Sequence, residues 1–211
     1  MNGSDSRGSN VDRMPVLPPD GRSLVGSTVR LDPLTLADAE ALLPCFADPR
    51  GYAQGYVMHD RPTDTDAMRA LLTARILRPG KVPYTVRVGD AVVGTSSLMD
   101  VDVANERTHI GSTLYHPDRW GTEVNPETKL LLLGHAFDDC GFGRVKIQTD
   151  ALNTRSIAAI AKLGATREGT LRRHMRREDG TFRDTVVFSI LRDEWPAVRE
   201  GLLSRIARAA V

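Results

Sequence analysis

The chain has 211 residues, 41% of them hydrophobic and 26% charged, a size and composition that suit one soluble domain with its own core. Its 28 basic and 27 acidic residues leave a formal charge of +1, which argues against a nucleic-acid partner because such proteins carry a basic excess or stripe. The longest apolar run, residues 130–133, cannot span a bilayer, and the N-terminal residues contain no hydrophobic signal core. We therefore expect a cytoplasmic protein without a membrane segment.

The first 22 residues are rich in Gly, Ser, Asp and Pro. We predict that they form a flexible tail ahead of a single domain over residues 23–211. The two cysteines, Cys45 and Cys140, fall in apolar helical patterns and are expected to be buried free thiols. Neither they nor the five histidines have the spacing of metal ligands, so no metal site is predicted.

The first half of the domain is expected to begin with a strand over residues 28–31 and a helix from Thr35, which Pro44 should shorten or bend. A second helix follows Pro62, with Thr63 or Asp64 as its cap. Three or four strands come next, over residues 84–88, 91–98 and 109–115, with the pairing through residues 99–108 left open. A Gly-Asp turn joins the first two.

The long helix of the second half has the strongest start signal in the chain. Asn125 suits the N-cap, Pro126 suits the first helical position, and Glu127 favours the positive end of the helix dipole. An apolar stripe follows, and Gly141 can close the helix. We therefore predict a helix that opens around Asn125-Pro126.

The remaining elements are a strand over residues 144–149, a short helix capped by Asn153, a hairpin of residues 169–176 and 182–191, and a C-terminal helix. Strands joined through helices favour a parallel pair, whereas hairpins require antiparallel neighbours. The predicted fold class is therefore α/β of the mixed α+β kind: a twisted mixed sheet of about six to seven strands with helices on both faces.

The turn over residues 116–125 joins a strand to the long helix and is a candidate anion site. The first turn of a helix has unpaired N–H groups and positive dipole charge, and Gly121 would let the backbone approach a phosphate closely. This signal alone is weak, because most strand-to-helix turns bind nothing.

Three further segments give the turn more weight: residues 144–150, the motif Asn153-x-x-Ser156, and residues 162–169 with Leu-Gly-Ala followed by Glu-Gly. Together with the strand–turn–helix, they resemble the GNAT acyltransferases. The resemblance is greatest to the RimJ/RimL-like branch, which acetylates the N-termini of ribosomal proteins, and it runs from about Thr28 to Trp195. It implies acetyl-CoA or another acyl-CoA as cosubstrate and an amine as acceptor. It also implies a coenzyme site at Tyr115, Trp120, Gly121, Thr122, Glu123, Val124, Asn125, Asn153 and Ser156.

Carried over from the family, the turn holds the coenzyme pyrophosphate, Asn153 binds the pantetheine arm and Ser156 protonates the departing thiolate. The turn departs from the family pattern at two positions. Trp120 stands where many relatives have a basic residue, and Glu123 stands at a glycine. A carboxylate beside the pyrophosphate would cost about 1 kcal/mol if solvated and several if buried, unless Glu123 points outward.

The residue expected to act as general base, which takes the proton from the amine, also differs from the family pattern. Relatives often carry Glu-Ile-Gly where this chain has His109-Ile110-Gly111. A histidine with a pKa of about 6.5 can take the proton at neutral pH, so His109 is a candidate substitute. Glu106 and His174 are alternative bases, and direct attack by a neutral amine with water as proton carrier is a third route.

The resemblance implies direct transfer of an acetyl or other short acyl group to the amine of a protein N-terminus or a small molecule. A longer acyl group such as succinyl would be favoured by Arg or Lys near the thioester. Two alternatives stay open: a non-catalytic acyl-CoA sensor on the same fold, and an interaction protein without coenzyme. A homodimer is also expected from the family.

Overall fold

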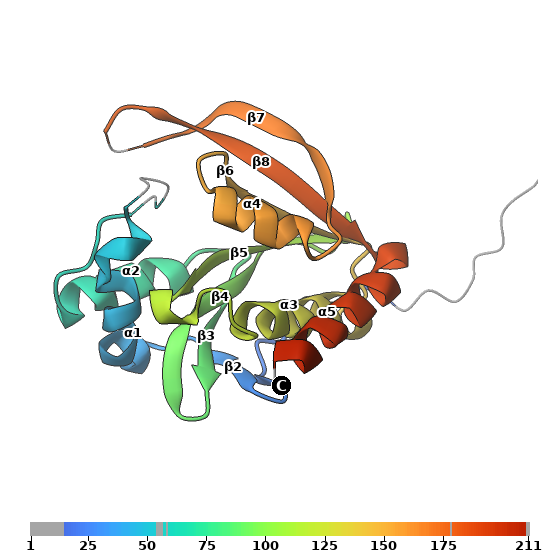
Figure 1. Cartoon of the computed structure of the whole chain (residues 1–211), viewed down its shortest axis with the longest axis horizontal. Helices are drawn as coiled ribbons and strands as arrows, with labels where there is room; N and C mark the ends of the chain where they lie inside the picture. The colour runs from blue at the N-terminus through green and yellow to red at the C-terminus, as the bar shows by residue number, and fades with distance from the viewer. Residues whose placement is uncertain (1–14, 54–56, 58, 178, 210–211) are drawn as a thin grey trace, which may run out of the picture.

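The computed structural model describes residues 15–53, 57, 59–177 and 179–209. It is built on one mixed sheet of eight strands in the order β1-β2-β3-β4-β5-β6-β8-β7 (Figure 1). The strands are β1 (Leu24–Val25), β2 (Val29–Pro33), β3 (Val82–Val88), β4 (Ala91–Asp102), β5 (Arg107–Tyr115), β6 (Arg144–Asp150), β7 (Thr166–Arg176) and β8 (Phe182–Leu191). The predicted mixed sheet is confirmed, with one strand more than expected because the two-residue β1 pairs with β2.

Helices cover both faces of the sheet, as predicted. The helices are α1 (Ala39–Ala47), α2 (Thr65–Ile76), α3 (Val124–Gly134), α4 (Thr154–Ala161) and α5 (Trp195–Ala209). Helices α1 and α2 pack together and against β3, β4 and β5, whereas α3 packs against α5, β1 and β2. Figure 1 shows these two groups at separate ends of the view, with the β7–β8 hairpin extending above α4.

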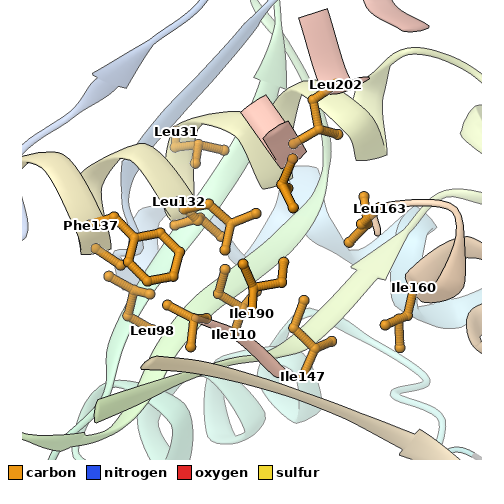
Figure 2. Close-up of a cluster of buried hydrophobic side chains, with 14 of the residues drawn as sticks. Leu31, Leu98, Ile110, Leu132, Phe137, Ile147, Ile160, Leu163, Ile190 and Leu202 are labelled. Carbon is orange, nitrogen blue, oxygen red and sulfur yellow. The ribbon is translucent and has the colours of Figure 1, made fainter. Parts of the chain in front are cut away.

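Two buried clusters correspond to the two faces. The larger one joins Leu98 and Ile110 of the sheet to Leu132 of α3 and Leu202 of α5 (Figure 2). The smaller one lies under α1 and α2. Each fully buried side chain of this size stabilises the fold by about 1.5–3 kcal/mol, so both helix layers are held firmly to the sheet.

Two of the predicted helix caps are confirmed. The Asp64 side chain accepts a hydrogen bond from Ala67 N at 2.8 Å, and that of Asn153 accepts one from Ser156 N at 3.0 Å. Both bonds satisfy N–H groups that have no partner within the first turn of a helix.

The predicted start of α3 was wrong by two residues. The helix begins at Val124, its N-cap is Glu123, and Pro126 is the third helical residue. Proline is tolerated there because the first N–H groups of a helix have no intrahelical partner, so no hydrogen bond is lost. The helix continues as a π-helix, His135–Asp139, and Gly141 follows with a φ of +75°.

The position of the site follows from the divergence of β5 and β6. These parallel strands pair only between residues 107–110 and 144–147; beyond them β5 bonds to β4 and β6 bonds to β8. A bulge accompanies the divergence, because Ser112 and Thr113 of β5 stand opposite one residue of β4, and Ser112 has a φ of +49°. The sheet therefore opens between the ends of β5 and β6.

Residues 15–22 lie against the end of the α3 segment: Leu17 N donates to Cys140 O at 2.9 Å, and Arg22 pairs with Asp139 at 2.6 Å. Both cysteines are buried free thiols, as predicted. None of the described helices is long and apolar enough to cross a membrane. In the described part of the chain, no three His, Cys, Asp or Glu side chains gather as a metal site would require.

Candidate active site

A cavity of about 1060 Å³ occupies the opening between β5 and β6. Its lining comes from α2, α3, α4, both diverging strands and the β7–β8 hairpin. On the α3–α4 side it reaches Asn125 and Asn153, and on the α2 side it reaches His59 and Arg75. A cavity open to both layers can receive two different molecules whose reacting groups meet at the divergence.

Six of the nine predicted coenzyme-binding residues line this cavity. They are Tyr115, Trp120, Gly121, Asn125, Asn153 and Ser156. Thr122, Glu123 and Val124 are not among the lining residues, and Val124 is fully buried in the larger core. The Glu123 side chain is half-buried at the N-cap of α3 and is not among the residues that line the cavity.

An arginine from another element lies beside Trp120, the residue that stands where many relatives have a basic one. The guanidinium carbon of Arg155, in α4, lies 3.3 Å from the centre of the Trp120 ring. An arginine stacked on an indole face gains cation–π attraction and keeps its charge. The turn at the start of α3 thus has a cation beside it, although none stands in the turn at position 120.

Asn153 caps α4 through its Oδ1, which leaves its amide nitrogen available to the cavity. Ser156 lies one turn further and is half-buried. Capping and coenzyme contact are therefore compatible at Asn153, because they use different atoms of the same side chain.

His109 and Asp100 form a hydrogen-bonded pair at the edge of the cavity. His109 is 4% exposed, and its Nδ1 lies 3.2 Å from Asp100 Oδ2. Its Nε2 is buried and has no hydrogen-bond partner among the described residues. A side chain added at Gly111 would lie 2.9 Å from this nitrogen, so the glycine leaves the space beside it free.

The electrostatics of the pair define the tautomer. The hydrogen bond from His109 and the charge of Lys146 hold the pKa of Asp100 well below its usual range, so Asp100 is a carboxylate. Nδ1 of His109 must then carry the hydrogen that it donates. Burial lowers the pKa of His109, so at neutral pH its Nε2 is an unprotonated acceptor.

The structure separates the other two candidate bases. Glu106 lies in the turn between β4 and β5, where its backbone oxygen accepts from Gly143 N at 2.8 Å, and it does not line the cavity. His174 does line the cavity, from β7, and its Nδ1 lies 3.0 Å from Thr185 Oγ1. The divergence therefore brings His109, His174 and Ser156 to one cavity and leaves Glu106 outside it.

Lys129 is a site residue that the sequence analysis missed. It lies in α3, is 5% exposed, and its Nζ donates to Thr113 Oγ1, within the bulge, at 3.1 Å. Burial lowers its pKa to about 7. The available signal was a lysine four residues before Leu133 on the apolar face of the helix, where a charged side chain needs a reason.

Comparison with known proteins gives consistent results. Residues 28–166 match the model of the acetyltransferase (GNAT) domain. The curated N-acetyltransferase p20 of Bacillus licheniformis, itself uncharacterized, is 25% identical over 178 residues, which cover 82% of this chain and 98% of that protein. A candidate acetyltransferase from T. thermophilus is 36% identical and superposes with a TM-score of 0.80 over 87% of this chain and 96% of that one.

A likeness to the RimJ branch is present at the level of the fold. Mycobacterium smegmatis RimJ, solved in complex with CoA-disulfide, has a TM-score of 0.73 at 20% identity, covering 86% of this chain and 90% of its own.

Proposed function

Because this chain belongs to the GNAT acetyltransferase family, and is thus an acyl-CoA-dependent N-acyltransferase, we propose that its acceptor is the amine of a protein N-terminus or of a small molecule. The acyl group is acetyl or another short acyl group, transferred by direct attack. The observation that carries this proposal is the Asp100–His109 pair: His109 lines the cavity between β5 and β6, and its Nε2 has no hydrogen-bond partner among the described residues.

The α3–α4 side of the cavity suits the coenzyme. The start of α3 offers backbone N–H groups and positive dipole charge for the pyrophosphate, with Gly121 at a φ of +80° in the turn. Arg119 and Arg155 also line this side and add two positive charges. Asn153 is free to donate its amide hydrogens to the pantetheine arm.

The amine approaches from the α2 side in this proposal. His109 Nε2 accepts the proton that the amine loses as its nitrogen bonds to the acyl carbon and the carbon–sulfur bond breaks. Asp100 holds the imidazole in the required tautomer and stabilises the imidazolium that forms. Ser156 supplies the proton for the thiolate, and solvent returns a proton from His109 to Ser156 before the next turnover. Lys129 stabilises negative charge that develops near Thr113.

His109→Gln tests this assignment. General-base catalysis contributes roughly 10²–10⁴-fold, so we expect kcat/KM to fall by about that factor while the Kd for acetyl-CoA changes less than about twofold. Transfer would be followed by thiol release and by mass spectrometry of products, with N-terminal peptides and small amines as acceptors. His116→Gln is the matched control, because His116 caps a turn and does not line the cavity.

Two results would contradict the proposal. One is a His109→Gln variant as active as His116→Gln. The other is wild-type protein that binds acetyl-CoA but acylates no amine in the panel, which would support the acyl-CoA sensor instead.

A further inference from the structure

Two cations meet the bulge of β5 from the α2 side of the cavity. Arg75 of α2 donates from its Nη1 to Ser112 O at 3.3 Å and to Thr95 Oγ1 at 3.4 Å. Lys81, just before β3, donates from its Nζ to Ser112 Oγ at 2.9 Å. Both side chains are half-buried, and Arg75 lines the cavity.

Neither cation has a carboxylate partner among the described residues. By contrast, Arg87, also half-buried, pairs with Asp38 at 2.6 Å and with Asp32 at 3.0 Å. Residues 54–56 and 58, the undescribed positions between α1 and α2, include no Asp or Glu. The positive charge at the bulge therefore has no counter-ion on the described part of the chain.

The acidic residues that do line the cavity are already engaged. Asp100 holds His109 and Lys146, Glu168 pairs with Arg144, and Asp150 pairs with Arg177. None of them neutralises the two cations at Ser112. Anionic groups from a bound molecule would meet an uncompensated positive potential there.

Arg75 is also held in place. Its guanidinium lies 4.9 Å from the centre of the Phe46 ring, and its Nη2 lies 3.4 Å from His59 Nε2. Burial lowers the pKa of Arg75 to about 10 and that of Lys81 to about 7. A preorganised, partly desolvated guanidinium binds a carboxylate strongly, because little side-chain freedom is lost and the charges are poorly screened.

We propose that Arg75, with Lys81 beside it, binds a substrate carboxylate at the Ser112 bulge, on the same side of the sheet as the Asp100–His109 pair. The inference rests on the proposed function, because it places the carboxylate on a molecule that takes part in acyl transfer. The carboxylate belongs either to the acyl chain, as in succinyl-CoA, or to the amine acceptor, as in an amino acid.

Matched pairs of probes separate these two sources. Calorimetry would compare acetyl-CoA with succinyl-CoA, and acyl-transfer kinetics would compare phenethylamine with phenylalanine. If the acyl chain carries the carboxylate, the wild type binds succinyl-CoA at least about tenfold more tightly than acetyl-CoA. If the acceptor carries it, the wild type acylates phenylalanine with at least about tenfold higher kcat/KM than phenethylamine.

Arg75→Gln should abolish the preference for the carboxylated probe, succinyl-CoA or phenylalanine. The value for its partner without the carboxylate, acetyl-CoA or phenethylamine, should stay nearly unchanged. Arg75→Lys should restore part of the preference. Arg69→Gln is the control, because Arg69 is an exposed residue of the same helix that pairs with Asp66 and does not line the cavity. Lys81→Gln, which should reduce the same preference, replaces Arg75→Gln if that variant does not fold.

The inference is overturned if the wild type prefers neither carboxylated probe, or if Arg75→Gln weakens both members of a pair equally. Wild-type protein that binds neither acetyl-CoA nor succinyl-CoA would instead overturn the proposed function itself. Retained acetyl transfer without any carboxylate preference removes only the anion subsite.

Discussion

A histidine in place of a carboxylate changes the acid–base chemistry available at position 109. Its Nδ1 is held by Asp100, and only Nε2 is left to accept a proton. The pairing was not predictable from the sequence. It depends on an irregular register between Met99 and Asp102 in β4, where Asp100 takes a φ of +51° and turns its carboxylate to the neighbouring strand. The sequence pointed to His109 as a base but not to its partner.

Asp100 has two effects on His109: its charge raises the pKa of the imidazole, and its hydrogen bond fixes the tautomer. Asp100→Asn should reveal both in one pH–rate profile. Burial lowers the pKa of His109 and Asp100 raises it, so removing the charge should lower that pKa further. In the wild type, kcat/KM should rise with pH through an apparent pKa below 6.5. In the variant this limb should move to lower pH, while the plateau falls by about tenfold or more because the tautomer is no longer fixed.

A pH–rate profile of both proteins checks this expectation. A limb that moves to higher pH in Asp100→Asn, or a plateau that does not change, would contradict the role given to the pair.

Burying the charged amine of Lys129 at the site lowers the stability of the fold at neutral pH. Its folded-state pKa of about 7 lies below the unfolded value of about 10.4, so between these values the unfolded chain binds the extra proton. The stability contribution of this lysine therefore falls as the pH drops from about 10 to about 7. Lys129→Met should raise the free energy of unfolding at pH 7 by roughly 1–3 kcal/mol and lower kcat by roughly tenfold.

Urea denaturation at pH 7 and pH 10 tests the stability effect, and the gain should shrink at the higher pH. A variant that is less stable than the wild type at pH 7 would show that the amine stabilises the fold.

At the scale of elements, the helices and strands were predicted well where neighbouring residues in the sequence determine them. The caps at Asp64 and Asn153 and the hairpin strand Phe182–Leu191 appear where their residue types placed them. The start of α3 was displaced because proline fits several positions of a first turn. The two-residue β1 was missed because it is too short to show an alternating pattern, although it pairs with the nearby β2. The π-helix was missed because it continues the apolar stripe of α3 without a break.

Asn153 combines a structural and a binding role, and one substitution can divide them. Asp is as good an N-cap as Asn, so Asn153→Asp should keep the melting temperature nearly unchanged. It removes the amide donor and places a carboxylate in the cavity. We expect the Kd for acetyl-CoA to rise by about tenfold or more.

Calorimetry and thermal unfolding measure the two quantities independently. An unchanged Kd would remove Asn153 from the coenzyme site, and a large loss of stability would show that its capping bond is not reproduced by Asp.

At the scale of the whole molecule, the site exists because the sheet opens. A bulge at Ser112 and the end of the β5–β6 pairing at Ile110 and Ile147 leave a cavity that connects the α2 layer with the α3–α4 layer. The sequence motifs located one half of this cavity, through Asn153-x-x-Ser156 and the turn before α3. The other half, with Arg75, was not predictable, because it is assembled by α2 and the bulge from residues far apart in the chain.

The central claim is that coenzyme and amine meet at this opening, with His109 as the base. A crystal structure with acetyl-CoA tests it most directly. The account predicts the pyrophosphate at the first turn of α3, and the thioester beside Ser112 and Thr113. It also predicts His109 Nε2 within about 6 Å of the acyl carbon, the reach of one bridging water. A coenzyme bound elsewhere, or a thioester separated from His109 by the sheet, would contradict it.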